Sequence, residues 1–260
     1  MPRQLFTFLY SLFTCSTVGY INEGITKAKF NTVGINFTAV DGNGIQLDDI
    51  KGDGLYGSED PDAADQIQIW QPETGTYENW YYYVCEADHS EDGWWDLATQ
   101  TTMFKDVHPE GLANGSSVWL LSSSESSGGA ASIAGAVDVA KTVTLTLTKG
   151  KFNLFGNPFP VGLQVNNADQ VTWENAFGSE DPDAADQIQV WDAATGTYEN
   201  WYYYVCEADH SEDGWWDLAT QTQMFQDVHP NGLAAGVPVW FLSNAAAGGT
   251  FDVTFKTPMK

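Results

Sequence analysis

The chain has 260 residues, of which 35 are acidic and 10 are basic, so its formal net charge is −25 at pH 7. Hydrophobic residues make up 43% of it and aromatic residues 14%, which argues against disorder and allows one large or two ordinary domains. The negative field repels phosphate groups, so nucleic acid and anionic membrane surfaces are disfavoured as partners. Cations, neutral ligands and basic proteins are favoured, and a solvated surface that only keeps the protein soluble is the alternative.

The first 15 residues resemble a leader. Arg3 supplies one positive charge, an apolar run follows from Leu5 to Phe13, and Thr14 to Thr17 are small or polar. The run is too short to span a bilayer as a helix, and the pattern predicts a signal peptide over residues 1–15. The expected location is therefore extracellular or at the cell surface. An ordinary first strand is the alternative.

An internal repeat determines the expected architecture. Residues 57–119 align without a gap on residues 178–240, and only ten of the 63 positions differ. A repeat of about 120 residues is too long for a solenoid unit or a propeller blade, so each copy is expected to be a whole domain. We predict two tandem homologous domains over residues 16–139 and 140–260, with a boundary near Val139–Thr142.

In chain order, the first shared feature is an acidic loop, Ser58–Asp65, which recurs as Ser179–Asp186. Several carboxylates in one loop can converge as hard oxygen ligands of Ca²⁺, the one cofactor that the sequence suggests. The spacing lacks the glycine and the final glutamate of an EF-hand, and a solvated turn is the alternative. The candidate metal ligands are Asp60, Asp62, Asp65, Asp181, Asp183 and Asp186.

A β-hairpin is predicted next. The segments Gln66–Trp70 and Thr76–Val84 have strand character, and Gly75 between them supplies a positive φ at the turn. Trp80–Tyr83 places aromatic side chains on both faces of the second strand. The strand is therefore either covered on both sides or exposes a binding or assembly surface, and cross-strand aromatic pairing favours the covered strand.

The loop Glu86–Asp96, repeated as Glu207–Asp217, contains two adjacent tryptophans after a run of acidic residues. Both cannot face the core of an extended segment, so one is expected at the surface. An exposed indole beside carboxylates can stack on a sugar while the acids accept its hydroxyl groups. The alternative is that one tryptophan packs and the other covers the loop. The candidate ligand-binding residues are Trp94, Trp95, Asp92, Asp96, Trp215, Trp216, Asp213 and Asp217.

Evidence for catalysis is weak. The four histidines are His89, His108 and their copies, and the chain contains neither a G-x-S-x-G nor an H-E-x-x-H motif. Cys85 and His89 are too far apart in an extended chain to form a dyad. Asp and Glu are so abundant that finding two carboxylates with the arrangement of a glycosidase pair would not indicate catalysis. We predict no catalytic residue. Cys85 and its copy Cys206 either bridge the copies or lie buried as small apolar residues.

The rest of the chain is dominated by strand patterns, with helical character limited to short candidates in Trp94–Gln100 and Thr101–Val107. A Ser/Gly/Ala-rich stretch, Ser122–Ala136, is expected to be a loop or loose hairpin. The fold class is therefore all-β, with two antiparallel sandwiches or small barrels and at most one or two helical turns per copy. Strands are expected at Val118–Leu121, Val143–Thr148, Val239–Leu242 and Thr250–Phe255.

One segment order carries a family resemblance. Copy 2 contains Gly156-Asn157-Pro158-Phe159-Pro160, then the D-x-I-x-x-W run Asp186–Trp191, and finally the G-x-x-x-W run Gly236–Trp240. This order resembles the β-domains of uncharacterised exported bacterial surface proteins. Copy 1 departs from it, with Gly34-Ile35-Asn36-Phe37 in the first position. The resemblance implies an exported β-fold and supplies no site.

These patterns predict a non-catalytic extracellular or cell-surface protein with a structural or adhesive role, or a subunit of an extracellular assembly. Its partners would be a glycan, another protein or further copies of itself. A tandem carbohydrate-binding module, with or without Ca²⁺, is the alternative. A secreted glycoside-active enzyme is the less favoured one.

Overall fold

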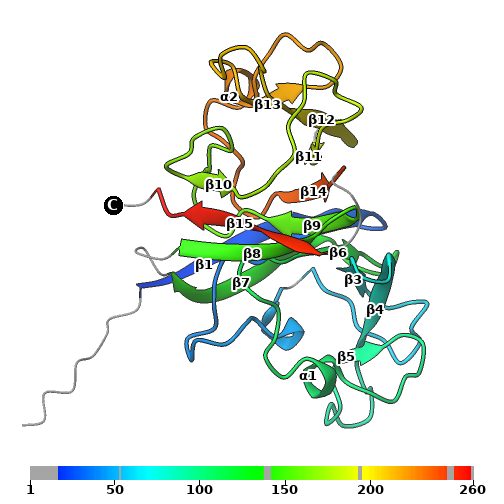
Figure 1. Ribbon diagram of the computed structural model, residues 1–260. Coiled ribbons are helices and arrows are strands. Elements are labelled where there is room, and N and C mark those ends of the chain that lie inside the picture. The colour runs from blue at the N-terminus through cyan, green and yellow to red at the C-terminus, as the bar shows by residue number, and fades with distance from the viewer. Residues whose placement is uncertain (1–16, 53, 138–141, 193–194, 245–248, 259–260) are drawn as a thin grey trace, which may run out of the picture.

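The computed structural model describes residues 17–52, 54–137, 142–192, 195–244 and 249–258 (Figure 1). The predicted leader and most of the predicted boundary near Val139–Thr142 lie outside these residues. We refer to residues 17–137 as half 1 and to residues 142–258 as half 2.

Half 1 is built from two antiparallel sheets. One has five strands in the order β2-β6-β3-β4-β5, and the other pairs β1 with β7. The strands are β1 (Thr17–Ile25), β2 (Phe30–Gly34), β3 (Gln66–Gln71), β4 (Thr76–Tyr83), β5 (Gly93–Asp96), β6 (Ser117–Leu121) and β7 (Gly129–Val137), with the 3₁₀ turn η1 (Leu47–Asp49) and the helix α1 (Phe104–Val107) between them.

Half 2 repeats this arrangement. Its five-stranded sheet has the order β9-β14-β11-β12-β13, and its smaller sheet has the order β10-β15-β8. The elements are β8 (Thr142–Thr148), β9 (Phe152–Gly156), β10 (Val171–Trp173), β11 (Gln187–Asp192), β12 (Thr197–Tyr204), β13 (Gly214–Asp217), α2 (Phe225–Val228), β14 (Pro238–Leu242) and β15 (Thr250–Lys256).

The apolar core of each half lies between its two sheets. In half 1, Ile133 of the small sheet and Ile67 of the large one belong to one buried cluster, whose members fall within residues 25–133. The equivalent cluster of half 2, with Val253 and Ile188, falls within residues 143–255. An all-β antiparallel sandwich is thus confirmed. Figure 1 shows the hairpins of the two halves at opposite ends of the molecule.

The predicted hairpin is confirmed in both halves. β3 pairs with β4 from Gln66–Tyr81 to Gln71–Thr76, and β11 pairs with β12 in the same register. Gly75 and Gly196 each have a φ of 69°, a left-handed conformation that favours glycine. The hairpin therefore forms because a strand pattern on each side meets a turn that only glycine fits without strain.

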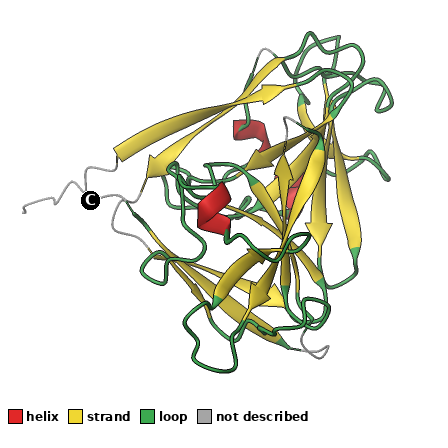
Figure 2. Ribbon diagram, turned by 90° about the horizontal axis from the view of Figure 1, so that it is seen from above, coloured by secondary structure: helices red, strands yellow, loops and turns green. Residues whose placement is uncertain are grey.

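Helices are limited to single turns among the described residues (Figure 2). α1 lies within the predicted Thr101–Val107, whereas the other helical candidate, Trp94–Gln100, is wrong. Its first residues form β5, because pairing with β4 lets Trp94 enter the core. None of the helices in the described ranges is long and apolar enough to cross a membrane.

The Ser/Gly/Ala-rich stretch Ser122–Ala136 was predicted to be a loop or loose hairpin, and for its second part this is wrong. β7 is a nine-residue strand that pairs with β1 from Thr17–Val137 to Ile25–Gly129. Ala131 and Ile133 are fully buried. Small residues give β7 a weak strand pattern in the sequence. In the fold, pairing with β1 and packing on the core stabilise the strand.

Candidate functional site

The paired tryptophans of the acidic loop divide between core and surface. Trp94 is 1% exposed and Trp215 is 0% exposed, so both lie in the cores, out of reach of a ligand. Trp95 is half-buried, packs edge-on against Tyr83 at 5.7 Å, and donates from Nε1 to the Glu91 carbonyl at 2.9 Å. Trp216 repeats this geometry. The structure therefore fits the alternative, in which one indole packs and the other covers the loop.

The carboxylates predicted to accompany these tryptophans hold their own loops. Asp92 accepts from the Cys85 backbone N–H at 2.9 Å and contacts His89 Nδ1 at 3.1 Å. Asp96 accepts from the backbone N–H and the hydroxyl of Thr99 at 2.8 and 2.6 Å. Their copies do the same. Each of these side chains thus stabilises a turn of its own loop.

The candidate metal ligands are dispersed rather than convergent. Asp65 is fully buried and accepts backbone bonds from Ser123 at 2.6 Å and Tyr56 at 2.8 Å, and burial raises its pKa against the effect of these bonds. Asp60 accepts from the Asp62 backbone at 3.0 Å. Half 2 repeats both features through Asp181, Asp183 and Asp186. Across the described ranges, no three acidic, histidine or cysteine side chains form a metal-binding group. Calcium stays a prediction.

That prediction has a direct test. If the acidic loops bind a structural Ca²⁺, millimolar Ca²⁺ raises the melting temperature relative to EDTA by mass action. The same midpoint in both conditions contradicts it.

The four histidines each contact a carboxylate, and neither Cys85 nor Cys206 forms a disulfide. His108 Nε2 lies 2.8 Å from Glu78 Oε2, and the copies His229 and Glu199 are 2.5 Å apart. Cys85 and Cys206 are free thiols, so the bridge considered from the sequence is not formed.

A large hollow lies between the halves, where equivalent residues exchange contacts. The ring centroids of Trp70 and Trp240 are 5.2 Å apart, and those of Trp191 and Trp119 are 6.0 Å apart. Trp70 and Trp191 are equivalent, as are Trp119 and Trp240. Such reciprocity is the signature of an interface with approximate two-fold symmetry.

Glycines let the backbones meet at this interface. A Cβ on Gly34 would lie 2.6 Å from the Cα of Gly236. On the reciprocal side the Gly156 N–H donates to the Gly115 carbonyl at 2.8 Å. The β2 edge of one large sheet is thereby brought against the β9 edge region of the other.

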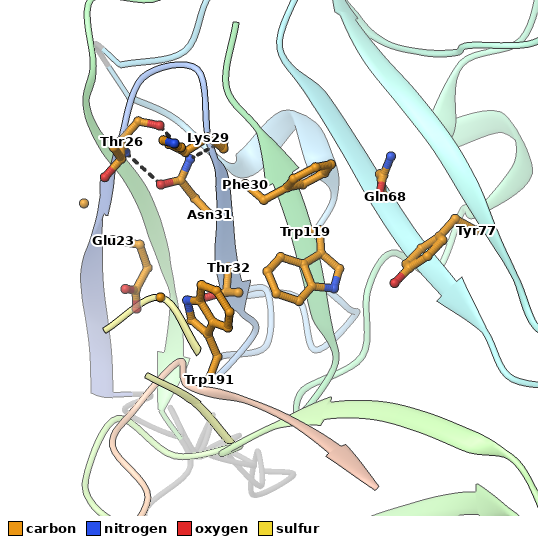
Figure 3. Close-up of a pocket in the computed structure, with 12 residues that line it drawn as sticks. Glu23, Thr26, Lys29, Phe30, Asn31, Thr32, Gln68, Tyr77, Trp119 and Trp191 are labelled. Atoms are coloured by element: carbon orange, nitrogen blue, oxygen red, sulfur yellow. Dashed lines mark hydrogen bonds between the residues drawn. The ribbon is translucent and has the colours of Figure 1, made fainter. Parts of the chain in front are cut away.

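One side of this interface is open. We call it the inter-half groove, a cavity of about 880 Å³ that is walled by β1, β2, β3, β4 and β6 of half 1 and by the β11–β12 hairpin of half 2 (Figure 3). Its aromatic lining is Phe30, Tyr77, Trp119 and Trp191, and its polar lining includes Glu23, Lys29, Asn31, Thr32 and Gln68. Phe30 is 50% exposed and packs edge-on to Trp119 at 6.2 Å. In Figure 3, Glu23 and Trp191 lie toward one end of the view and Tyr77 and Gln68 toward the other.

The opposite side of the interface is held by hydrogen bonds. Trp70 Nε1 donates to the Phe152 carbonyl at 2.7 Å, and the Thr148 hydroxyl donates to Glu73 at 3.0 Å. Among the described residues on the groove side, no hydrogen bond joins Trp191 to Phe30. The Thr148–Glu73 hydrogen bond has no counterpart on the groove side either, because half 2 has alanine at position 194, which is equivalent to Glu73. A difference in sequence thus accompanies the difference between the two sides.

Glu23 occupies a distinctive place beside the groove. Its Oε1 lies so near Gly236 that a Cβ at position 236 would clash with it, so this edge of the groove is formed by the Glu23 carboxylate packed against the backbone of Gly236. The equivalent position in half 2 is Leu145, whose side chain lies against Gly115, the equivalent of Gly236. Burial raises the pKa of Glu23.

Sequence reasoning missed the groove. Its residues come from separate strands of both halves, and nothing in one copy indicates how the other lies against it. The sequence did contain a sign that the two sides of the interface differ. In the alignment of the copies, Glu73 corresponds to Ala194 and Glu23 corresponds to Leu145. Comparison with protein-family models, curated proteins and solved structures gives no match. The resemblance to exported surface proteins remains a prediction.

Proposed function

We propose that the protein is a non-catalytic adhesive protein of the cell exterior or cell surface, and that it binds carbohydrate in the inter-half groove. The observation that carries this proposal is the lining of the groove, in which Trp119, Trp191 and Tyr77 stand among amide, hydroxyl and charged side chains. Indole and phenol rings stack on the apolar faces of sugars, while the polar groups exchange hydrogen bonds with the hydroxyls.

The extracellular setting is supported by the leader-like first 15 residues and by the resemblance to exported β-domains. The net charge of −25 disfavours nucleic acid and anionic membranes as the partner, whereas a neutral or cationic glycan is compatible with it. A volume of about 880 Å³ lies within the usual range for ligand pockets.

The test is a glycan array followed by titration of the best oligosaccharide. Trp191→Ala removes a ring that half 2 contributes to the groove, and a loss of affinity of about two- to twelvefold is expected, since stacking on an aromatic side chain is worth about 0.5–1.5 kcal/mol. Phe177→Ala is the matched control, because Phe177 is 49% exposed in half 2 and does not line the groove. Its affinity should equal that of the wild type.

A double variant, Trp95→Ala with Trp216→Ala, tests the acidic loops as the site. If it abolishes binding while Trp191→Ala does not, the sugar binds at the loops and the groove proposal is wrong. No binding to any glycan rejects the carbohydrate proposal altogether.

A second role, as a subunit of an extracellular assembly, is favoured by the reciprocal contacts of Trp70, Trp119, Trp191 and Trp240. One half recognises a copy of itself through these rings, so the same surfaces could pair between chains. Sedimentation at high concentration, with and without Ca²⁺, is the measurement. A strictly monomeric protein in both conditions rejects the assembly role.

A further inference from the structure

The groove contains a carboxylate that the interface itself does not require. Glu23 and Leu145 occupy equivalent positions, and each lies against a glycine of the other half. At Leu145 this position holds an apolar side chain, which suits a contact between two packed halves. At Glu23 the same place in the fold holds a charge that must be withdrawn partly from water, so packing alone does not account for it.

Glu23 also lacks a partner. Within the described ranges its carboxylate forms neither a hydrogen bond nor an ion pair, although it is half-buried and burial raises its pKa. Lys29, the other charged side chain in the groove, is exposed and forms no ion pair with it. A desolvated, unpaired charge is unfavourable unless something supplies the opposite charge. A cation beside Glu23 would supply that opposite charge.

The surroundings favour a cation as well. Trp119, Trp191 and Tyr77 line the same groove, and the faces of aromatic rings attract ammonium groups. The whole chain carries a net charge of −25, which concentrates cations around it. A sugar chain that bears ammonium groups would satisfy the rings with its pyranose faces and the carboxylate with its charge.

We propose that the inter-half groove selects a glycan whose sugars carry free, protonated amino groups, and that Glu23 accepts one of those ammonium groups. This rests on the proposed carbohydrate-binding function and specifies its substrate class. The partner is thus a glucosamine-type polymer. Acetylation of its nitrogen replaces the ammonium group with a neutral amide and so removes the charge that Glu23 would pair with.

The experiment compares two probes that differ only at the nitrogen, glucosamine oligomers and N-acetylglucosamine oligomers of the same length. Titration calorimetry is run at a pH low enough to protonate the sugar amine and high enough to keep the Glu23 carboxyl ionised. The wild type should bind the amine form at least about tenfold more tightly, because a hydrogen bond to a charged group is stronger than one between neutral groups. Glu23→Gln should lose this preference and keep the affinity for the acetylated oligomer.

Glu73→Gln is the matched control, because Glu73 is an exposed carboxylate on the hydrogen-bonded side of the interface, outside the groove. It should keep the preference of the wild type. Equal binding of both probes by the wild type, or an unchanged preference in Glu23→Gln, overturns the inference and leaves carbohydrate binding intact. Binding of neither probe while other glycans bind also overturns it. Failure to bind any glycan rejects the proposed function itself.

Discussion

The two halves are alike in their hairpins and unlike where they meet. β3–β4 and β11–β12 share register, turn conformation and buried tryptophans. At the interface, Glu73 bonds to Thr148 on one side, whereas the other side is an aromatic groove with Glu23 beside it. A shared fold thus fixes the framework of each half, and a few differing residues decide which side of the interface stays open.

The largest expected effect tests the likeness of the halves. Asp65 and Asp186 are fully buried, and each accepts two hydrogen bonds from backbone N–H groups. In Asp65→Asn or Asp186→Asn, the amide NH2 group would replace one accepting oxygen and point at a backbone N–H, which is also a donor. We expect each variant to lose about 3 kcal/mol of stability. Hydrogen exchange should show the loss in half 1 for the first variant and in half 2 for the second. Equal loss throughout the chain would contradict the prediction of two domains and indicate one cooperative unit.

The next effect concerns the close approach at the centre of the interface. Gly34→Ala places a methyl group 2.6 Å from backbone atoms of Gly236, so about 1–3 kcal/mol of destabilisation is expected. At the equivalent Gly156 the nearest atoms are 3.6 Å away, and Gly156→Ala should be tolerated. Denaturant midpoints measure both. If the two variants unfold alike, the halves do not approach as described.

A smaller effect depends on pH. Burial raises the pKa of Glu23 above 4.5, so its ionisation costs more in the folded protein than in the unfolded chain. Glu23→Gln should therefore be more stable than the wild type at neutral pH, by at most about 1 kcal/mol because the group is partly solvated. The difference should disappear below pH 4.5, where the carboxyl is protonated in both states. Melting curves across pH decide, and a less stable variant at neutral pH would show that the carboxylate has a stabilising partner.

The smallest effect concerns the hydrogen-bonded side. Glu73→Ala gives half 1 the residue that half 2 has at position 194 and removes the bond from Thr148, so about 0.5 kcal/mol should be lost. Denaturant unfolding measures this change. A loss of more than about 2 kcal/mol would exceed one exposed hydrogen bond and assign Glu73 a wider role in joining the halves.

The sequence predicted what local patterns encode. Alternation in Val143–Thr148 and Thr250–Phe255 predicted β8 and β15, and the Thr74-Gly75-Thr76 turn predicted the hairpin. β7 was missed because its small residues gain stability from the core and from pairing with β1, more than 100 residues away. The burial of Trp94 rather than Trp95 depended on which face of β5 met the core, a register that pairing with β4 decides.

The candidate site was less predictable than the fold for the same reason. Trp191 and Trp119 belong to different copies, and their meeting depends on how two folded halves dock rather than on any local pattern. Aromatic residues near acids drew attention to the Glu86–Asp96 loop, where the carboxylates are instead occupied by their own turns.

The reciprocal contacts of Trp70, Trp119, Trp191 and Trp240 have one more consequence. In a dimer of identical chains, any substitution at a two-fold interface appears in both subunits, so neither edge can change alone. Covalent tandem linkage lifts that symmetry constraint. Positions 23 and 145, or 73 and 194, can then diverge independently. One side of the pseudo-two-fold interface can therefore become specialised for holding the halves together, while the other side stays open to a ligand.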